Sequence, residues 1–415
     1  MIANGDITLF SPNDVPGLYE TFFNDQEKFK ELYETAERNT HLRKKVVKAV
    51  DLFSTFMEER KNTGRVYLMN VDHANDHGSF KKEIAPIRMS NLCCEIDLPT
   101  TPLNDLNDPD GEIALCTLSA INWGLIKNPS DFERPCTLAV RGLDALLSYQ
   151  EYPVKAAKNA TMKRRPLGIG IINLAYFLAR NNTNYTNPNL NLIDEYAESW
   201  SYYLIKASAD LAVEYGACPG NDETLYSCGI TPNQTYKKDV NELMPHKERL
   251  NWKSLREQLK ETGIRNSTLM ALMPAETSAQ ISNSTNGIEP PRSYVSVKQS
   301  KDGVLKQVVP GFPYYKNKYE LLWDQESPEG YIKIMAVLQK YVDQGISVNT
   351  SYNPQFFKDE KIPMSVMLKH LIMCYKYGIK QLYYFNTYDG AGDDSEEKTP
   401  EAEENYTTSQ EDCES

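Results

Sequence analysis

The stretch GIGIINLAYFLA, residues 168–179, sets the fold class of this chain. It opens with a short apolar run of strand length, and a loop or helix is expected to follow. Short apolar runs of the same kind recur at residues 66–71, 92–98 and 112–122. Such an alternation predicts an α/β fold, closed as a barrel or a large mixed sheet with helices outside. The run lacks the third glycine of a dinucleotide-binding fingerprint, so it predicts no site of that kind.

Two longer stretches have the apolar periodicity of helices. Residues 25–64 repeat apolar side chains at spacings of three and four, and Gly64 is placed as a C-terminal stop. Residues 192–216 keep the same spacing. We therefore expect one helix over each stretch.

The composition is that of an ordinary globular protein. The 415 residues are 40% apolar, which suffices for at least one core. No apolar run reaches the roughly 18 residues that a membrane span needs, and the start has no basic, apolar export signal. Eight cysteines are too sparse for a disulfide scaffold. A cytoplasmic protein is expected.

Most of the net charge of −12 lies in the last residues. Residues 389–415 hold eleven acidic residues and one lysine, which leaves the rest of the chain near −2. A near-neutral body argues against nucleic-acid binding, because that would need clustered lysine and arginine. The acidic tail has almost nothing to bury and is expected to be disordered.

The segment RMSNLCCEIDLPTTPL, residues 88–103, contains the most reactive side chains. If residues 91–98 form a strand, alternate side chains share a face. One face then holds Leu92, Cys94, Ile96 and Leu98, and the other holds Asn91, Cys93, Glu95 and Asp97. Cys94 is interpreted as a core thiol, whereas Cys93 shares its face with an amide and a carboxylate. On spacing alone, an ordinary half-buried strand explains the pattern best.

Two further thiols have a suggestive context. Cys116 lies in an apolar run close enough in a sheet to approach Cys93, although a buried inert thiol is the usual explanation for such a position. Cys413 lies in the acidic tail. It is either incidental or exchanges electrons with a disulfide elsewhere.

Residues 273–292 contain a candidate anion site. The letters MPAETSAQ place Pro274, Glu276, Thr277 and Ser278 at an expected helix start. Free N–H groups and hydroxyls at such a start suit a phosphate, and an ordinary helix cap is the simpler interpretation.

Two adjacent tyrosines end an expected strand. Tyr383 and Tyr384 lie in LYYFNT, just before the acidic tail. Adjacent tyrosines usually reflect strand propensity and packing. Because consecutive strand residues face opposite ways, a shared role requires the chain to bend there.

Together these stretches resemble the catalytic large subunit of class I ribonucleotide reductase. The resemblance runs from about Ile7 to the terminal DCES, in the blocks SNLCCEIDLPT, GEIALCTLSAIN, RRPLGIGIIN, RNSTLMALMPAETSAQISNSTNGIEPPR, DGVLKQVVPG and LYYFNTYDG. It implies the C-terminal part of a ten-stranded α/β barrel with helices outside, a central finger loop and a disordered acidic tail. The implied units are a partial barrel at 1–290, a small α/β subdomain at 291–362, the last barrel helix and strand at 363–388, and a redox tail at 389–415.

The resemblance also implies how the chain would reduce ribonucleoside diphosphates to deoxyribonucleotides. Cys93 would form a thiyl radical that removes the 3′ hydrogen, Glu95 would take the 3′-hydroxyl proton, and Asn91 would bind the sugar hydroxyls. Cys116 would be one of a pair of reducing thiols. The implied substrate-binding residues are Asn91, Leu92, Cys93, Cys94, Glu95, Pro274, Ala275, Glu276, Thr277 and Ser278.

The remaining implied residues connect the site to partners. Tyr383 and Tyr384 would relay an electron and proton between Cys93 and a separate small subunit, which holds the di-metal tyrosyl-radical centre. Cys413 would re-reduce the active-site disulfide and be recharged by thioredoxin or glutaredoxin, although the family usually has two cysteines in this tail. This chain would bind no metal or cofactor itself, and no nucleic acid or membrane.

The second reducing thiol is not found upstream of Cys93. No cysteine precedes that residue, and the resemblance begins about halfway along the family's catalytic subunit. We therefore expect a separately encoded N-terminal half that docks along open sheet edges. This chain is expected to be inactive on its own.

Three other interpretations are open at this point. An inactive partial subunit would only bind partners. A glycyl-radical reductase shares the barrel and thiyl chemistry, but it needs a glycine-radical motif where this chain has the tyrosine pair. Zinc binding by Cys93, Cys94 and Cys116 would need a tetrahedral geometry that adjacent cysteines on opposite strand faces provide poorly.

Overall fold

The computed structural model describes residues 5–106, 108–300 and 303–389. The strands are β1 (Asp6–Phe10), β2 (Lys44–Lys48), β3 (Leu68–Met69), β4 (Leu118–Asn122), β5 (Gly168–Ile172), β6 (Val295–Ser300), β7 (Gly303–Val308), β8 (Thr350–Tyr352), β9 (Gln381–Leu382) and β10 (Phe385–Thr387). The helices are α1 (Leu18–Asn24), α2 (Gln26–Arg38), α3 (Ala49–Thr63), α4 (Val71–Asp76), α5 (Glu133–Tyr149), α6 (Lys155–Arg164), α7 (Leu174–Arg180), α8 (Leu190–Tyr215), α9 (Pro232–Thr235), α10 (Trp252–Thr262), α11 (Glu276–Ile281), α12 (Phe312–Tyr315), α13 (Glu329–Gln339) and α14 (Met364–Lys376).

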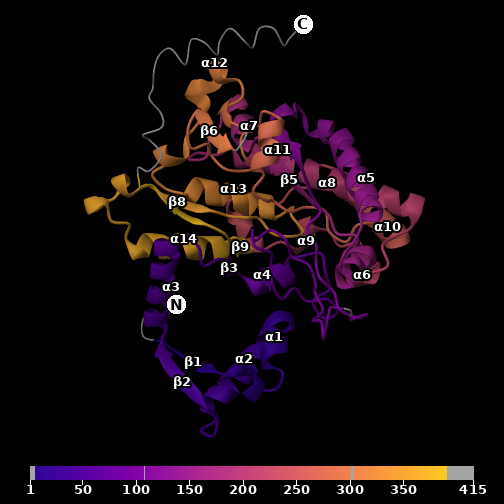
Figure 1. The fold of residues 1–415 in the computed structure, drawn as a ribbon, viewed down its shortest axis with the longest axis vertical. Coiled ribbons are helices and arrows are strands. Elements are labelled where there is room, and N and C mark those ends of the chain that lie inside the picture. The colour runs from indigo at the N-terminus through magenta and orange to yellow at the C-terminus, as the bar shows by residue number, and fades with distance from the viewer. Residues whose placement is uncertain (1–4, 107, 301–302, 390–415) are drawn as a thin grey trace.

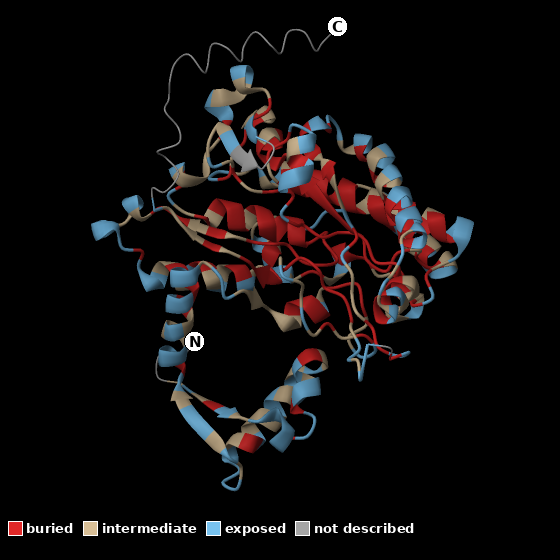
Figure 2. Cartoon of the chain, viewed as in Figure 1, coloured by how far each residue is buried: buried red, intermediate tan, exposed pale blue. Residues whose placement is uncertain are grey.

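The molecule has a large body and a small N-terminal unit. Figure 1 shows the small unit, made of β1, β2, α1 and α2, joined to the body by α3. Figure 2 shows buried residues gathered around α8 and α13 in the body, whereas the small unit is mostly exposed. The core that supports a site therefore lies in the body.

Parallel strands and extended segments form a row through the body. β4 pairs with β5 in parallel, and single bridges join Ile169 to Met270 and Leu272 to Ile346. β8 and β10 also pair in parallel, and the N–H of Tyr383 donates to the carbonyl of Val348 at 2.7 Å. Parallel strands connected by helices confirm the α/β class.

The finer description of the fold stays a prediction. Hydrogen-bond pairing within the described ranges gives two-stranded sheets, of which β4 with β5 and β8 with β10 are parallel. β3 pairs with β9 in antiparallel fashion, and β6 with β7 forms a separate hairpin. The ten-stranded closure, the finger loop and the domain boundaries stay predictions.

The opening stretch folds as predicted. Residues 168–172 form β5, in which every residue is buried, and α7 follows. Gly170 allows a close approach to the next segment, because a Cβ there would lie 2.6 Å from the sulfur of Met273 and 2.9 Å from the carbonyl oxygen of Ala271. The glycines thus permit tight packing within the row of strands.

The helix predicted at residues 192–216 is confirmed. α8 ends at Tyr215, and Gly216 follows with a φ of 82°. α8 packs against α5, α10 and α13 in the body. Its Trp200 is fully buried, with a ring centroid 6.1 Å from that of Trp123. This helix is a central element of the core.

The single helix predicted at residues 25–64 is wrong in its middle. Asp25 caps α2 and Gly64 ends α3 with a φ of 68°, as expected. Between the two helices, β2 pairs with β1 in antiparallel fashion. Val46 belongs to this strand and is 56% exposed. Strand pairing with a distant segment outweighs the local helical spacing here.

The other predicted strands are shorter than their apolar runs. Only residues 68–69 of the first run and residues 118–122 of the third form strands, and residues 92–98 form none. Within the residues that the structure describes, no helix is long and apolar enough to cross a membrane.

Candidate active site

The segment that carries Cys93 is a turn rather than the predicted strand. The N–H of Cys94 donates to the carbonyl of Asn91 at 3.1 Å, and Cys94 has a φ of 59°. The side-chain oxygen of Asn91 accepts from the N–H groups of Glu95 and Ile96, at 3.0 and 3.1 Å. An Asn side chain that satisfies backbone donors in this way favours a turn over an extended strand.

The turn changes which side chains share a face. Leu92 was predicted to lie with Cys94 on the apolar face, but it is 77% exposed, whereas Cys94 is buried. The predicted grouping of Asn91, Cys93 and Glu95 is close to what the structure shows, because the turn folds Asn91 back onto Glu95. The amide of Asn91 donates to the carboxylate of Glu95 at 2.7 Å.

The turn is anchored on the row of strands. The hydroxyl of Ser347 donates to the carbonyl of Cys93 at 2.5 Å and to the carboxylate of Glu95 at 3.4 Å. The N–H of Gly345 donates to the carbonyl of Glu95 at 2.9 Å. Beyond the turn, Ile96 is buried in a small apolar cluster. The position of Cys93 is therefore set by residues 345–347.

Cys116 lies beside this turn, as predicted. The amide of Asn91 also approaches the sulfur of Cys116, at 3.6 Å. Cys116 precedes β4 and is exposed, so it is not the buried inert thiol that its apolar surroundings indicated. Asn91 thus contacts both the carboxylate and one of the thiols.

Burial governs the protonation of these groups. Burial raises the pKa of the Glu95 carboxyl, although hydrogen bonds from Asn91 and Ser347 lower it. Desolvation raises the pKa of the Cys93 thiol, and the hydrogen bond from Tyr383 lowers it. Desolvation and the Glu95 charge raise the pKa of Cys116 to about 11. At neutral pH both thiols keep their hydrogen, which suits hydrogen-atom transfer better than nucleophilic attack.

The tyrosine pair meets Cys93 directly. Tyr383 and Tyr384 lie in a break between β9 and β10, which provides the bend that a shared role requires. Their ring centroids are 3.9 Å apart, with an interplanar angle of 42°. The hydroxyl of Tyr383 donates to the sulfur of Cys93 at 3.8 Å. The structure therefore connects Tyr384, Tyr383 and Cys93 in order.

Three neighbours of the pair were missed by the sequence analysis. The ring of Tyr67 lies 4.7 Å from that of Tyr383 and 5.7 Å from that of Tyr384. Buried Arg60 donates to the carbonyl of Tyr383 at 3.1 Å. Asn349 accepts from the N–H of Tyr384 at 2.9 Å. Tyr67 directly precedes β3, whose pairing with β9 was not predicted from local patterns.

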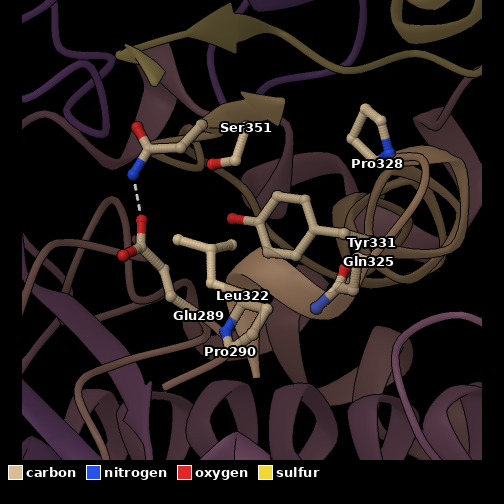
Figure 3. A pocket seen from close by; sticks show the side chains of 8 residues that line it. Glu289, Pro290, Leu322, Gln325, Pro328, Tyr331 and Ser351 are labelled. Atoms are coloured by element: carbon tan, nitrogen blue, oxygen red, sulfur yellow. Dashed lines mark hydrogen bonds between the residues drawn. The ribbon is translucent and has the colours of Figure 1, made fainter. Parts of the chain in front are cut away.

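Asn349 also lines a pocket. Figure 3 shows Glu289, Leu322, Tyr331 and Ser351 around it, and the dashed line marks the bond from the amide of Asn349 to the carboxylate of Glu289. The Tyr331 hydroxyl is buried without a hydrogen-bond partner. None of the residues predicted for the site lines this pocket.

The predicted phosphate loop begins a short helix. α11 starts at Glu276, and Ala275 at its N-cap makes no side-chain cap hydrogen bond. Pro274, Glu276, Thr277 and Ser278 are exposed. In the described part of the chain, the hydroxyls of Thr277 and Ser278 have no hydrogen bond to the turn at residues 91–95. These hydroxyls therefore do not form the ordinary helix cap that was the simpler interpretation of the sequence.

Two further predictions concern metals and the tail. Among the residues with described positions, no group of three or more His, Cys, Asp or Glu side chains is placed to hold a metal ion. The zinc interpretation therefore has no support from this part of the structure. Cys413 lies outside the described residues, so its predicted redox role stays a prediction.

Comparisons with known proteins point in one direction. The family model described as "Ribonucleotide reductase, barrel domain" matches residues 1–385. The chain is 56% identical over 398 residues to the ribonucleoside-diphosphate reductase subunit alpha of Haemophilus influenzae, covering 96% of this chain and 53% of that protein. It is 53% identical over 401 residues to the ribonucleoside-diphosphate reductase 1 subunit alpha of Escherichia coli K12, covering 96% of this chain and 53% of that protein.

More distant comparisons agree. The phage T4 subunit alpha is 46% identical over 410 residues, covering 97% of this chain and 53% of that protein. The class Id ribonucleotide reductase alpha subunit of Actinobacillus ureae has a similar fold, with a TM-score of 0.60 at 20% identity over 82% of this chain and 61% of that one. The chain spans about half the length of the curated relatives it matches.

Proposed function

Because this chain belongs to the ribonucleotide reductase barrel-domain family, we propose that it supplies the catalytic thiols of a ribonucleoside-diphosphate reductase. It would reduce ribonucleoside diphosphates to 2′-deoxyribonucleoside diphosphates by thiyl-radical chemistry in the cytoplasm. The observation that carries the proposal is the contact between the hydroxyl of Tyr383 and the sulfur of Cys93. It places a tyrosine in reach of a thiol that keeps its hydrogen.

The first step is a hydrogen-atom exchange. Oxidation of Tyr384 and then Tyr383 removes an electron and a proton from each ring in turn. The Tyr383 radical then takes the hydrogen atom of the Cys93 thiol, so that the O–H bond re-forms as the S–H bond breaks. The oxidising radical centre belongs to a separate small subunit, and this chain contributes the two adjacent tyrosine rings.

The second step acts on the sugar. The Cys93 thiyl radical takes the 3′ hydrogen of the ribose, and the Glu95 carboxylate accepts the 3′-hydroxyl proton. The 2′-hydroxyl then leaves as water, taking the proton it needs from one of the two reducing thiols, and a radical remains on the sugar. Asn91 binds the sugar hydroxyls, and residues 274–278 bind the diphosphate. The hydrogen bond from Asn91 fixes the position of the Glu95 carboxylate.

Two thiols then provide the two electrons that complete the reduction. Cys116 is one of them: one thiol hydrogen leaves in the water, the other is transferred to C2′, and the two sulfurs form a disulfide. Cys93 then returns its hydrogen to C3′ and Glu95 returns the proton to the 3′ oxygen, which regenerates the thiyl radical. We propose that its partner thiol comes from the remaining half of the catalytic subunit, since this chain spans about half the length of its relatives. Cys413 and thioredoxin or glutaredoxin would re-reduce the disulfide.

The test is reconstitution. This chain would be mixed with a polypeptide that carries the complementary half of the subunit and with the small subunit, and reduction of CDP would be measured. Turnover by the full mixture and none by this chain alone is expected. An inactive full mixture that assembles normally would contradict the proposal and favour a purely binding role.

A further inference from the structure

A buried side-chain contact links the Cys93 turn to the strand that leads to Tyr383. The amide of Gln381 donates to the carboxylate of Asp97 at 2.5 Å. Asp97 is 2% exposed and Gln381 is fully buried. Building on the function proposed above, we propose that Asp97 and Gln381 are a positioning pair that holds the Cys93 sulfur and the Tyr383 hydroxyl in contact.

The absence of a side chain at Gly345 makes this contact possible. A Cβ on Gly345 would lie 2.2 Å from the side-chain oxygen of Gln381 and 2.8 Å from its side-chain carbonyl carbon. The Gln381 side chain therefore passes directly over Gly345 on its way to Asp97. The N–H of Gly345 also donates to the carbonyl of Glu95, so one residue supports both the turn and the link.

Lys380 partly offsets the charge of Asp97. Its side-chain nitrogen is fully buried and donates to the carbonyls of Asp343 and Gln344 at 3.0 and 2.7 Å, and burial lowers the pKa of Lys380 to about 8. Burial raises the pKa of Asp97 to about 6, while Lys380 and Gln381 lower it. Asp97 is therefore ionised at pH 8, and a hydrogen bond to an ionised acceptor is stronger than a neutral one.

The link is not explained by stability alone. One carboxylate oxygen of Asp97 is buried without a hydrogen-bond partner, and so is the side-chain oxygen of Gln381. Buried, partly unsatisfied polar groups cost free energy that a pair of apolar side chains would avoid. A requirement for exact geometry at Cys93 and Tyr383 accounts for their presence.

The geometry matters because hydrogen-atom transfer needs the two atoms in contact. Cys93 lies four residues before Asp97, and Tyr383 lies two residues after Gln381. A shift of either segment would lengthen the 3.8 Å contact between sulfur and oxygen. A misplacement of about 1 Å can reduce the rate of an enzyme about 100-fold.

An exchange of donor and acceptor tests the pair. Gln381→Glu sets two carboxylates against each other at pH 8 and breaks the bond. Asp97→Asn keeps an acceptor oxygen for Gln381. The double variant Asp97→Asn with Gln381→Glu re-forms the bond with donor and acceptor reversed, and it has the same net charge as the original chain. Gln381→Met, which has no donor, serves if Gln381→Glu does not fold.

The first measurement needs no enzymatic activity. Iodoacetamide alkylation of Cys93 in the full chain is followed by mass spectrometry, with exposed Cys228 as the internal reference. Loss of the hydrogen bond to the charged Asp97 should make local opening of the Cys93 turn about 10-fold more frequent, and alkylation of Cys93 should accelerate by the same factor in Gln381→Glu or Gln381→Met. The double variant should return to the original rate. An unchanged rate in the single variants, or no recovery in the double variant, would overturn the proposal.

The second measurement uses the reconstituted complex. Gln381→Glu should lower kcat between about 10-fold and 100-fold while leaving KM for CDP unchanged, and the double variant should recover kcat. Equal kcat in all variants would refute the positioning role. If the alkylation rates change and recover as expected but the unmodified complex makes no deoxynucleotide, the proposed function fails and the link between the two segments stands.

Discussion

Replacement of Glu95 by glutamine separates the chemistry of the site from its architecture. The Glu95 carboxylate accepts from Asn91 at 2.7 Å and from Ser347 at 3.4 Å, and the residue is 1% exposed. A glutamine can turn its oxygen toward Asn91 and its amide toward the hydroxyl of Ser347, which retains an acceptor lone pair. Glu95→Gln therefore keeps the turn and removes the base.

The expected loss follows from the role of a general base. Such a group contributes about 10²- to 10⁴-fold to a rate, which corresponds to about 2.7 to 5.4 kcal/mol in the activation barrier. CDP reduction by the reconstituted complex should fall by this factor. Glu83→Gln is the matched control, because Glu83 is exposed and its change should leave turnover intact. Turnover of Glu95→Gln within about threefold of the original would refute the assignment of Glu95 as the base.

The raised pKa of Glu95 also predicts the sign of the change in the free energy of unfolding that Glu95→Gln causes. Burial raises the folded-state pKa of Glu95 above its ordinary value of 4.5. A raised folded pKa contributes stability below pH 4.5, and this contribution is lost as the pH rises through the folded pKa. Once the pH exceeds the folded pKa, the buried carboxylate therefore costs stability that glutamine does not. In urea unfolding at pH 7, the free energy of unfolding of Glu95→Gln should be equal to or greater than that of the original chain. Below pH 4.5 it should be smaller. The opposite order would contradict the burial argument.

Three further outcomes test the site. Tyr383→Phe keeps a ring beside that of Tyr384 but removes the hydroxyl at Cys93, so CDP reduction should stop while the free energy of unfolding changes by about 1 kcal/mol or less. Exposed Tyr314→Phe is the control, and an active Tyr383→Phe would exclude the relay. Asn91→Ala removes a donor that lowers the pKa of Glu95, so the acidic limb of the pH profile of kcat should move to higher pH, and an unmoved limb would contradict this electrostatic role. In the folded chain, iodoacetamide should modify exposed Cys116 and Cys228 before fully buried Cys136 and Cys374; mass spectrometry showing the buried pair modified first would contradict the fold.

Local sequence patterns predicted the elements whose apolar spacing matches their burial. Every residue of β5 is buried, as its continuous apolar run indicates, and α8 buries the apolar residues that recur at helical spacing. β2 was missed because the spacing around it suits a helix and its own sequence, KKVVK, has no apolar alternation. Partners that come from distant segments leave no periodic signal.

Tertiary pairing also explains which parts of the candidate site could not be predicted from the sequence. The residues of the turn and the tyrosine pair were predicted through their resemblance to a family, but the strand geometry assigned to the turn was wrong. The side-chain oxygen of Asn91 accepts from two backbone N–H groups. An alternating sequence pattern does not reveal these hydrogen bonds, which favour a turn. Ser347, Gly345 and Tyr67 reach the site only through tertiary pairing.

The central claim is that the Cys93 sulfur delivers the radical to the sugar. The most direct measurement is deoxynucleotide formation by the reconstituted complex carrying Cys93→Ser, with Cys228→Ser as the control for loss of an exposed thiol. A serine O–H bond is too strong for a tyrosyl radical to break, so Cys93→Ser should form no product while Cys228→Ser remains fully active. Product formation by Cys93→Ser would contradict the account.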